Sequence, residues 1–224
     1  MITARPLLMA APMVRSTIEG RKTQTRRTVK LPPWSTGNDG DVEIDERGMP
    51  QIIARTSGCF ADIPLLYKTG DLFWVKETFA HVANFPPTVR YYATDDVHEL
   101  RKRQPSIHMP RWASRLTLEI TDVRVERLQD ISEEDAEAEG IEYAIRPFGD
   151  WKLIPGIWDF EGLVNDGEQR CDPPPAIKYA YLWNSINAKA GTRWADNPWV
   201  WVLTFAVHHA NVDAVLAQRA EVAA

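Results

Sequence analysis

A lysine and a threonine stand three residues apart, as Lys22 and Thr25, within a segment that also holds Arg21, Arg26 and Arg27. A threonine hydroxyl is a weak nucleophile until a neighbouring base removes its proton. Lysine serves as that base when desolvation or nearby positive charge lowers its pKa. The pair therefore suits nucleophilic attack on an acyl group. A basic cluster after a helix-ending glycine also suits a solvated turn or a contact to phosphate, and the spacing alone does not choose between these interpretations.

Short elements must position this segment. Pro12 and Gly20 bound a run that predicts a short helix over residues 12–19. Further strands are predicted over Pro6–Ala11, Gly70–Phe79, Val89–Ala93 and Trp199–Val207. The most regular strand is Arg115–Val125, in which apolar and polar residues alternate and one face should be buried.

A second predicted helix begins after Ser132, a good N-cap residue, with Asp135 three positions later. It should run to Glu139 and stop at Gly140. The helix dipole disfavours a carboxylate at that end unless a cation lies beside it, and Lys22 is the cation that we expect there.

Two more helices are predicted toward the C-terminus. Residues 177–189 should form one, with Tyr181, Leu182 and Ile186 facing inward. The Ala-rich stretch from His209 to Ala224 suits a peripheral helix.

Three separated segments together resemble the ASCH domain, a β-barrel of the PUA-like superfamily, and in particular its small bacterial N(4)-acetylcytidine amidohydrolases. They are residues 12–27, Lys68–Val75 and Arg115–Gly140. Residues 105–115 also resemble the longer ASCH proteins that are common in phage and prophage genomes.

The resemblance implies an α+β fold: a PUA-like (ASCH) mixed β-barrel with flanking short helices and long loop insertions. It implies a single domain over residues 1–207, with insertions at about 31–66 and 143–175, and a C-terminal tail over residues 208–224. The second insertion is rich in Gly and Pro, and we expect it to be irregular and to cover the barrel mouth.

The resemblance also implies a function, the hydrolysis of N(4)-acetylcytidine, and a catalytic set of Lys22, Thr25 and Glu139. Glu137 is the main rival of Glu139. Either Thr25 attacks the acyl carbonyl, with Lys22 as base, or Glu139 activates a water molecule directly. We expect Arg27 and Glu77 to bind the nucleoside; for Glu77 the alternative is a salt bridge to Lys76 or to an arginine.

Two other functions remain open from the sequence. PUA-like folds commonly hold RNA, and a basic turn beside an aromatic strand suits single-stranded RNA. A ribonuclease, in which Lys22 and the arginines neutralise a phosphate, is the third. A buried carboxylate beside Lys22 would serve acyl transfer but oppose phosphate binding.

Composition limits the partners. The chain has 224 residues, with 26 Lys plus Arg against 31 Asp plus Glu, and its net charge of −5 argues against bulk attraction to duplex DNA.

Cys59 and Cys171 lie far apart, without a second cysteine at metal-ligand spacing. We therefore expect no metal and no cofactor. The apolar run near the N-terminus is too short to span a membrane, so a cytoplasmic protein is predicted. The resemblance implies a small modified nucleoside as its partner, with RNA as a further candidate.

Overall fold

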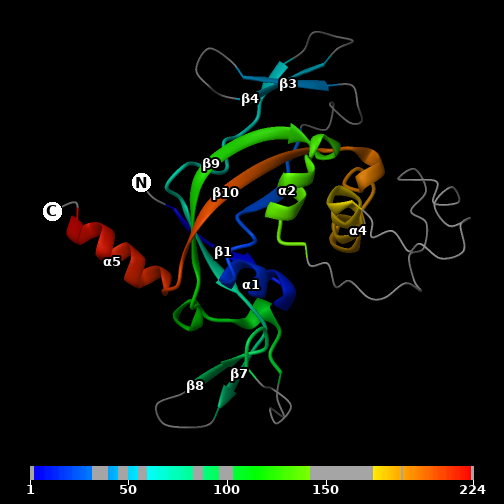
Figure 1. The fold of residues 1–224 in the computed structure, drawn as a ribbon. Coiled ribbons are helices and arrows are strands. Elements are labelled where there is room, and N and C mark those ends of the chain that lie inside the picture. The colour runs from blue at the N-terminus through cyan, green and yellow to red at the C-terminus, as the bar shows by residue number, and fades with distance from the viewer. Residues whose placement is uncertain are drawn as a thin grey trace, which may run out of the picture. The chain divides into compact units, whose positions relative to one another are not determined.

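A computed structural model describes residues 3–31, 40–44, 50–54, 60–82, 88–95, 103–141, 174–187 and 189–222. These residues form an α+β fold with one mixed sheet of five strands in the order β1-β6-β9-β10-β2 (Figure 1). The strands are β1 (Ala4–Leu8), β2 (Gln24–Thr28), β6 (Leu72–Lys76), β9 (Thr117–Arg127) and β10 (Trp199–His208). The expected α+β class is confirmed. Within the described residues β1 and β2 are the two edge strands of this sheet and do not pair with each other, so the expected closed barrel is not seen.

The chain divides into two compact units. The first comprises Met1–Gln24, Tyr67–Val123 and Thr204–Ala224, and the second comprises Thr25–Leu66 and Arg124–Leu203. Strands β9 and β10 each contribute residues to both.

In the first unit, β1 pairs in parallel with β6, and β6 pairs antiparallel with β9. A hairpin of β7 (Phe79–Val82) and β8 (Thr88–Tyr91) follows β6. Helix α1 (Ala11–Ile18) begins with proline in its first turn, and Gly20 just beyond it has a φ of +76°. A left-handed residue of this kind favours glycine and ends the helix, so the helix predicted over residues 12–19 is confirmed.

Helix α5 (Val212–Val222) completes the first unit and confirms the helix predicted in the C-terminal stretch. Its buried residues Val212 and Val215 pack against Leu72 and Trp74 of β6. Removing such side chains from water is what holds a short peripheral helix on a sheet.

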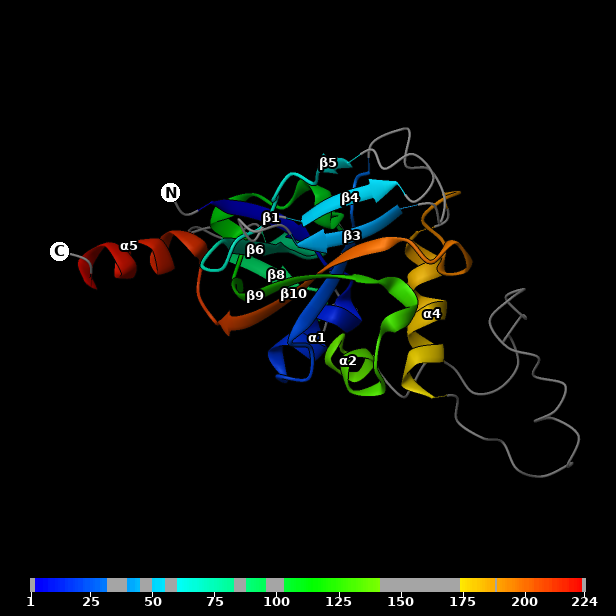
Figure 2. The ribbon, with the colours of Figure 1, turned by 90° about the horizontal axis from the view of Figure 1, so that it is seen from above.

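The second unit contains a three-stranded antiparallel sheet of β3 (Gly40–Ile44), β4 (Pro50–Ala54) and β5 (Phe60–Asp62). These strands lie in the insertion expected at about residues 31–66, so the described part of this insertion has regular structure. Figure 2 shows β3 beside β4.

The unit also contains α2 (Glu133–Ala138) and α4 (Pro175–Ile186), which lie side by side in both views (Figures 1 and 2). The Ser132 hydroxyl accepts a hydrogen bond from the backbone N–H of Asp135 at 3.1 Å, which confirms the predicted N-cap. Gly140 has a φ of +79° and ends the helix, as expected.

The inward face predicted for α4 was right for Leu182, which packs against the core, and wrong for Ile186, which is 65% exposed. The buried residues of the helix are Ile177, Lys178, Tyr179, Ala180 and Trp183. The helix is apolar around much of its circumference, so hydrophobic spacing did not single out one face; packing of Tyr179 and Trp183 against Trp194 did.

The strand predicted over residues 115–125 is observed as β9, two residues later along the chain, and Leu116, Leu118 and Ile120 are buried as expected. Thr117, on the face expected to be polar, is buried as well. The strand predicted at residues 199–207 is confirmed as β10. Short 3₁₀ turns lie at Ser106–His108, Arg111–Ala113, Leu128–Asp130 and Trp194–Asp196.

Nearly all of the insertion expected at about 143–175 lies outside the described residues. Among the helices that the structure describes, none is both long and apolar enough to cross a membrane.

Candidate active site

The turn after α1 places Lys22 in the interior of the first unit. Backbone N–H groups of Arg21 and Lys22 both donate to the carbonyl oxygen of Ser16, at 2.9 and 3.0 Å. The Lys22 side chain is buried, and its Nζ donates to the carbonyl oxygen of Gln24 at 2.8 Å. The amine is thereby held at the backbone of the residue that immediately precedes Thr25.

Strand β2 carries the candidate residues Thr25 and Arg27, with Arg26 between them. Thr25 and Arg26 are buried, and Arg27 is half-buried. The backbone enters the strand after Thr23, whose carbonyl oxygen accepts from the N–H of Phe205 at 2.9 Å. Because Lys22 and Thr25 are separated by just two residues, the backbone limits how far apart the two side chains can lie.

Arg26 is the centre of a charge cluster in the second unit. Its side chain has no exposed surface, and its guanidinium lies 2.8 Å from Asp135 Oδ2, 3.3 Å from Glu139 Oε1 and 3.7 Å from Glu126 Oε2. Arg124 also binds Asp135, at 2.7 Å, and pairs with Glu126. A buried guanidinium requires such partners, because desolvation of an uncompensated charge is costly.

Glu139 caps the C-terminal end of α2 and is buried. Its Oε1 accepts from Arg26 Nη1 and, at 3.4 Å, from the hydroxyl of Tyr179 on α4. The structure places the guanidinium of Arg26 beside this helix end; Lys22 at the same end stays a prediction. The acidic run Glu133–Glu139 was the sequence signal that a buried cation was needed, but nothing in the spacing pointed to Arg26 in particular.

Burial raises the pKa of Tyr179 well above 10, and the charge of Glu139 raises it further, while Arg26 and Arg27 act in the opposite direction. The phenol therefore stays protonated and donates its hydrogen bond to Glu139. Sequence analysis missed Tyr179, because a tyrosine in a helix is more often a packing residue than part of a polar site.

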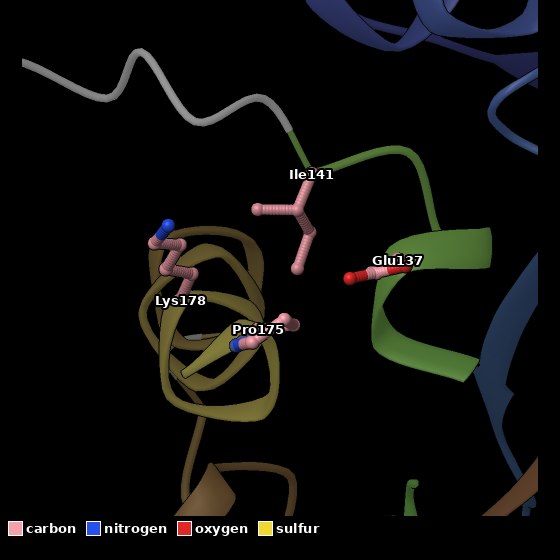
Figure 3. Close-up of a pocket in the computed structure, with 4 residues that line it drawn as sticks. All are labelled: Glu137, Ile141, Pro175 and Lys178. Atoms are coloured by element: carbon pink, nitrogen blue, oxygen red, sulfur yellow. The ribbon is translucent and has the colours of Figure 1, made fainter. Parts of the chain in front are cut away.

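Glu137, the rival of Glu139, lies on another side of α2. It is exposed and lines a small hollow with Ile141, Pro175 and Lys178 (Figure 3). Residues two positions apart on a helix differ by about 200°, which explains why one glutamate is buried among charged partners and the other faces solvent.

Glu77 follows β6 in the first unit and is 1% exposed. Arg115 Nε donates to its Oε1 at 2.8 Å and Arg115 Nη2 donates to its Oε2 at 2.9 Å. The guanidinium of Arg115 also stacks over the ring of Tyr91, 4.0 Å from the centroid. Burial raises the pKa of Glu77, and Arg115 opposes the rise. Of the two roles considered for Glu77, the salt bridge to an arginine is therefore observed.

The predicted site residues are divided between the units. Lys22 and Glu77 belong to the first, and Thr25, Arg27 and Glu139 belong to the second. Within the second unit the structure joins Glu139 to Arg26 and Tyr179. Grouping Glu139 with Lys22 rests on the resemblance.

In the part of the chain that the structure describes, no group of three or more His, Cys, Asp or Glu side chains is arranged to hold a metal ion. Cys59 and Cys171 lie outside it. Comparisons of the chain with protein-family models, with curated proteins and with solved structures found no match.

Proposed function

We propose that the protein is an amidohydrolase that removes the acyl group from N(4)-acetylcytidine or a related N(4)-acylated cytosine nucleoside, giving the cytosine nucleoside and a carboxylate. The observation that carries the proposal is burial. Lys22, Thr25 and Glu139 are 3%, 6% and 3% exposed, although Lys and Glu are rarely buried without a partner or a task. We also propose that the fold is of the ASCH type, because the mixed sheet with short flanking helices is compatible with it.

In the proposed reaction, Thr25 Oγ1 attacks the acyl carbonyl while neutral Lys22 takes its proton. Lys22 then gives that proton to the N4 nitrogen of cytosine as the C–N bond breaks. A water molecule attacks the acyl-threonine, Lys22 takes a proton from this water and returns it to Thr25, and the product leaves as a carboxylic acid that releases its proton to solvent and becomes the carboxylate. The hydrogen bond from Lys22 Nζ to the carbonyl of Gln24 supports this order, because it holds the amine next to the nucleophile's own backbone.

Glu139 orients Lys22 in this scheme. In a variant that uses the same residues, Glu139 activates the water molecule directly, and Thr25 and Lys22 polarise the carbonyl. Arg27 contacts the nucleoside. Since both oxygens of Glu77 bind Arg115, we propose that Glu77 contributes to substrate binding by holding this guanidinium.

The arginine contacts favour acyl transfer over phosphate binding. Arg21 pairs with Glu19, and Arg26 is surrounded by Asp135, Glu139 and Glu126. Arginines neutralised by carboxylates attract a phosphate backbone weakly, because the negative charges repel it. The basic segment is therefore less suited to RNA than its sequence indicates.

The test is incubation of the purified protein with N(4)-acetylcytidine, with cytidine and acetate followed by chromatography. A parallel reaction contains a single-stranded RNA oligonucleotide, and a Thr25→Val variant, close in shape but without the hydroxyl, serves as the control. We expect cytidine and acetate in equal amounts from the wild type and intact RNA. RNA cleavage or tight RNA binding without release of cytidine would replace the proposal with one of its two alternatives.

A further inference from the structure

Tyr179 is a buried polar residue for which neither the resemblance nor the proposed reaction has a role. Its ring packs against Trp183 and Trp194, with centroids 6.1 and 6.4 Å away. The ring position is set by these two tryptophans, so the hydroxyl has little freedom to move. A buried tyrosine hydroxyl needs a hydrogen-bond partner, and here that partner is Glu139.

Two donors meet on one oxygen of Glu139. The Arg26 guanidinium and the Tyr179 hydroxyl both bind Oε1, at 3.3 and 3.4 Å. The guanidinium also lies over the ring of Tyr179, 5.9 Å from its centroid. The donors belong to β2 and α4, so two separate elements hold a single carboxylate at the end of a third, α2.

This arrangement has a clear electrostatic reason. The C-terminal end of a helix carries partial negative charge and repels a carboxylate. Donors from outside the helix offset that repulsion and also select one side-chain orientation, which a catalytic group requires.

We propose that Tyr179 is a positioning residue for Glu139, whose carboxylate it holds, together with Arg26, in the orientation in which Glu139 acts. The catalytic part of this inference rests on the proposed function. The hydrogen bond itself does not.

The test begins with Tyr179→Phe, which keeps the ring, its packing against the tryptophans and its contact with Arg26, and removes only the hydroxyl. Tyr181→Phe, the same change two positions along the same helix, is the matched control. We expect Tyr179→Phe to lower kcat for N(4)-acetylcytidine by about 10-fold or more with KM nearly unchanged, since a misplaced catalytic group slows the chemical step without weakening substrate binding. Tyr181→Phe should retain the kinetics of the wild type.

A double-mutant cycle with Glu139→Met, which removes both oxygens that could accept from Tyr179, separates this inference from the proposed function. The free energies of unfolding of the wild type, the two single variants and the double variant should show coupling between the two positions. If the wild type proves inactive on N(4)-acetylcytidine, the proposed function fails, yet this coupling still supports the positioning contact. Zero coupling would overturn the inference, as would a Tyr179→Phe variant with unchanged kcat or with a raised KM alone, which would indicate direct contact with substrate.

Discussion

Arg26 and Glu139 are 113 residues apart in the sequence, and their side chains meet at 3.3 Å in the interior of one unit. The same guanidinium binds Asp135, one turn earlier on α2. A single buried cation on β2 thus contacts two carboxylates of a helix that carries no basic residue in its last turn. Because Asp135 and Glu126 also surround Arg26, the loss of Glu139 would not leave the guanidinium without a counter-charge.

Glu139→Gln should abolish hydrolysis of N(4)-acetylcytidine while the protein stays folded. Glutamine keeps an oxygen that can accept from Arg26 and Tyr179 but has no carboxylate charge. The free energy of unfolding should fall by at most about 1.5 to 3 kcal/mol, the usual value for a hydrogen bond to a charged group, because removing a negative charge from a helix C-terminus offsets part of the loss. Turnover is measured by release of cytidine, and stability by urea unfolding.

Glu137→Gln is the matched control, because Glu137 is exposed on the same helix. Its free energy of unfolding should differ from that of the wild type by no more than about 0.5 kcal/mol. Its turnover of N(4)-acetylcytidine should be that of the wild type. Loss of activity in Glu137→Gln alone would show that the resemblance was aligned two residues out of place.

Lys22→Arg should fold and lose nearly all amidohydrolase activity. Arginine stays protonated at any pH at which the protein is folded, so it cannot accept the proton of Thr25. The control is Lys30→Arg, an exposed lysine at the end of the same basic segment. Circular dichroism checks the fold, and near-normal turnover by Lys22→Arg would reduce Lys22 to an electrostatic contact.

Activity should survive dialysis against EDTA. In the proposed reaction the nucleophile and the base are both side chains, so no metal-bound water is required. Turnover is compared before and after dialysis, and again after zinc or magnesium is added. Activity that disappears on chelation and returns with a metal ion would contradict the mechanism.

Glu77 should give the stability of the protein a measurable pH dependence. Burial raises the pKa of its carboxyl above the ordinary value of 4.5, with Arg115 opposing the rise. The folded protein then keeps a proton that the unfolded chain has lost, so its free energy of unfolding decreases as the pH rises from 4.5 through the raised pKa. Urea unfolding of wild type and Glu77→Gln at a series of pH values should show this decrease in the wild type only.

Glu119 provides a control of opposite sign. Partial burial raises the pKa of Glu119, but hydrogen bonds from His208 and Arg219 outweigh it, and the pKa lies below 4.5. The contribution of Glu119 to stability is present above pH 4.5 and is lost as the pH falls through the lowered pKa.

For Glu77 the contradicting outcome is a wild type that gains stability relative to Glu77→Gln as the pH is raised. That result would show that the ion pair with Arg115, and not burial, controls the pKa of Glu77.

The elements next to the candidate site could be predicted from the sequence because they depend on near neighbours. Proline in the first turn and Gly20 beyond the end define α1, and the Ser132 hydroxyl begins α2 through a bond to a residue three positions away. Alternation along β9 places its apolar side chains on a buried face whatever lies opposite. Such signals act within a few residues, and the sequence displays them directly.

Tertiary structure alone decided which groups meet. Arg26 lies beside Glu139, and Tyr179 joins them from a helix whose buried face the sequence did not single out. These contacts link positions 113 and 40 residues apart, so they depend on how a strand and two helices pack. Burial then sets their strength, because the same charges that water would screen at the surface interact strongly in the interior.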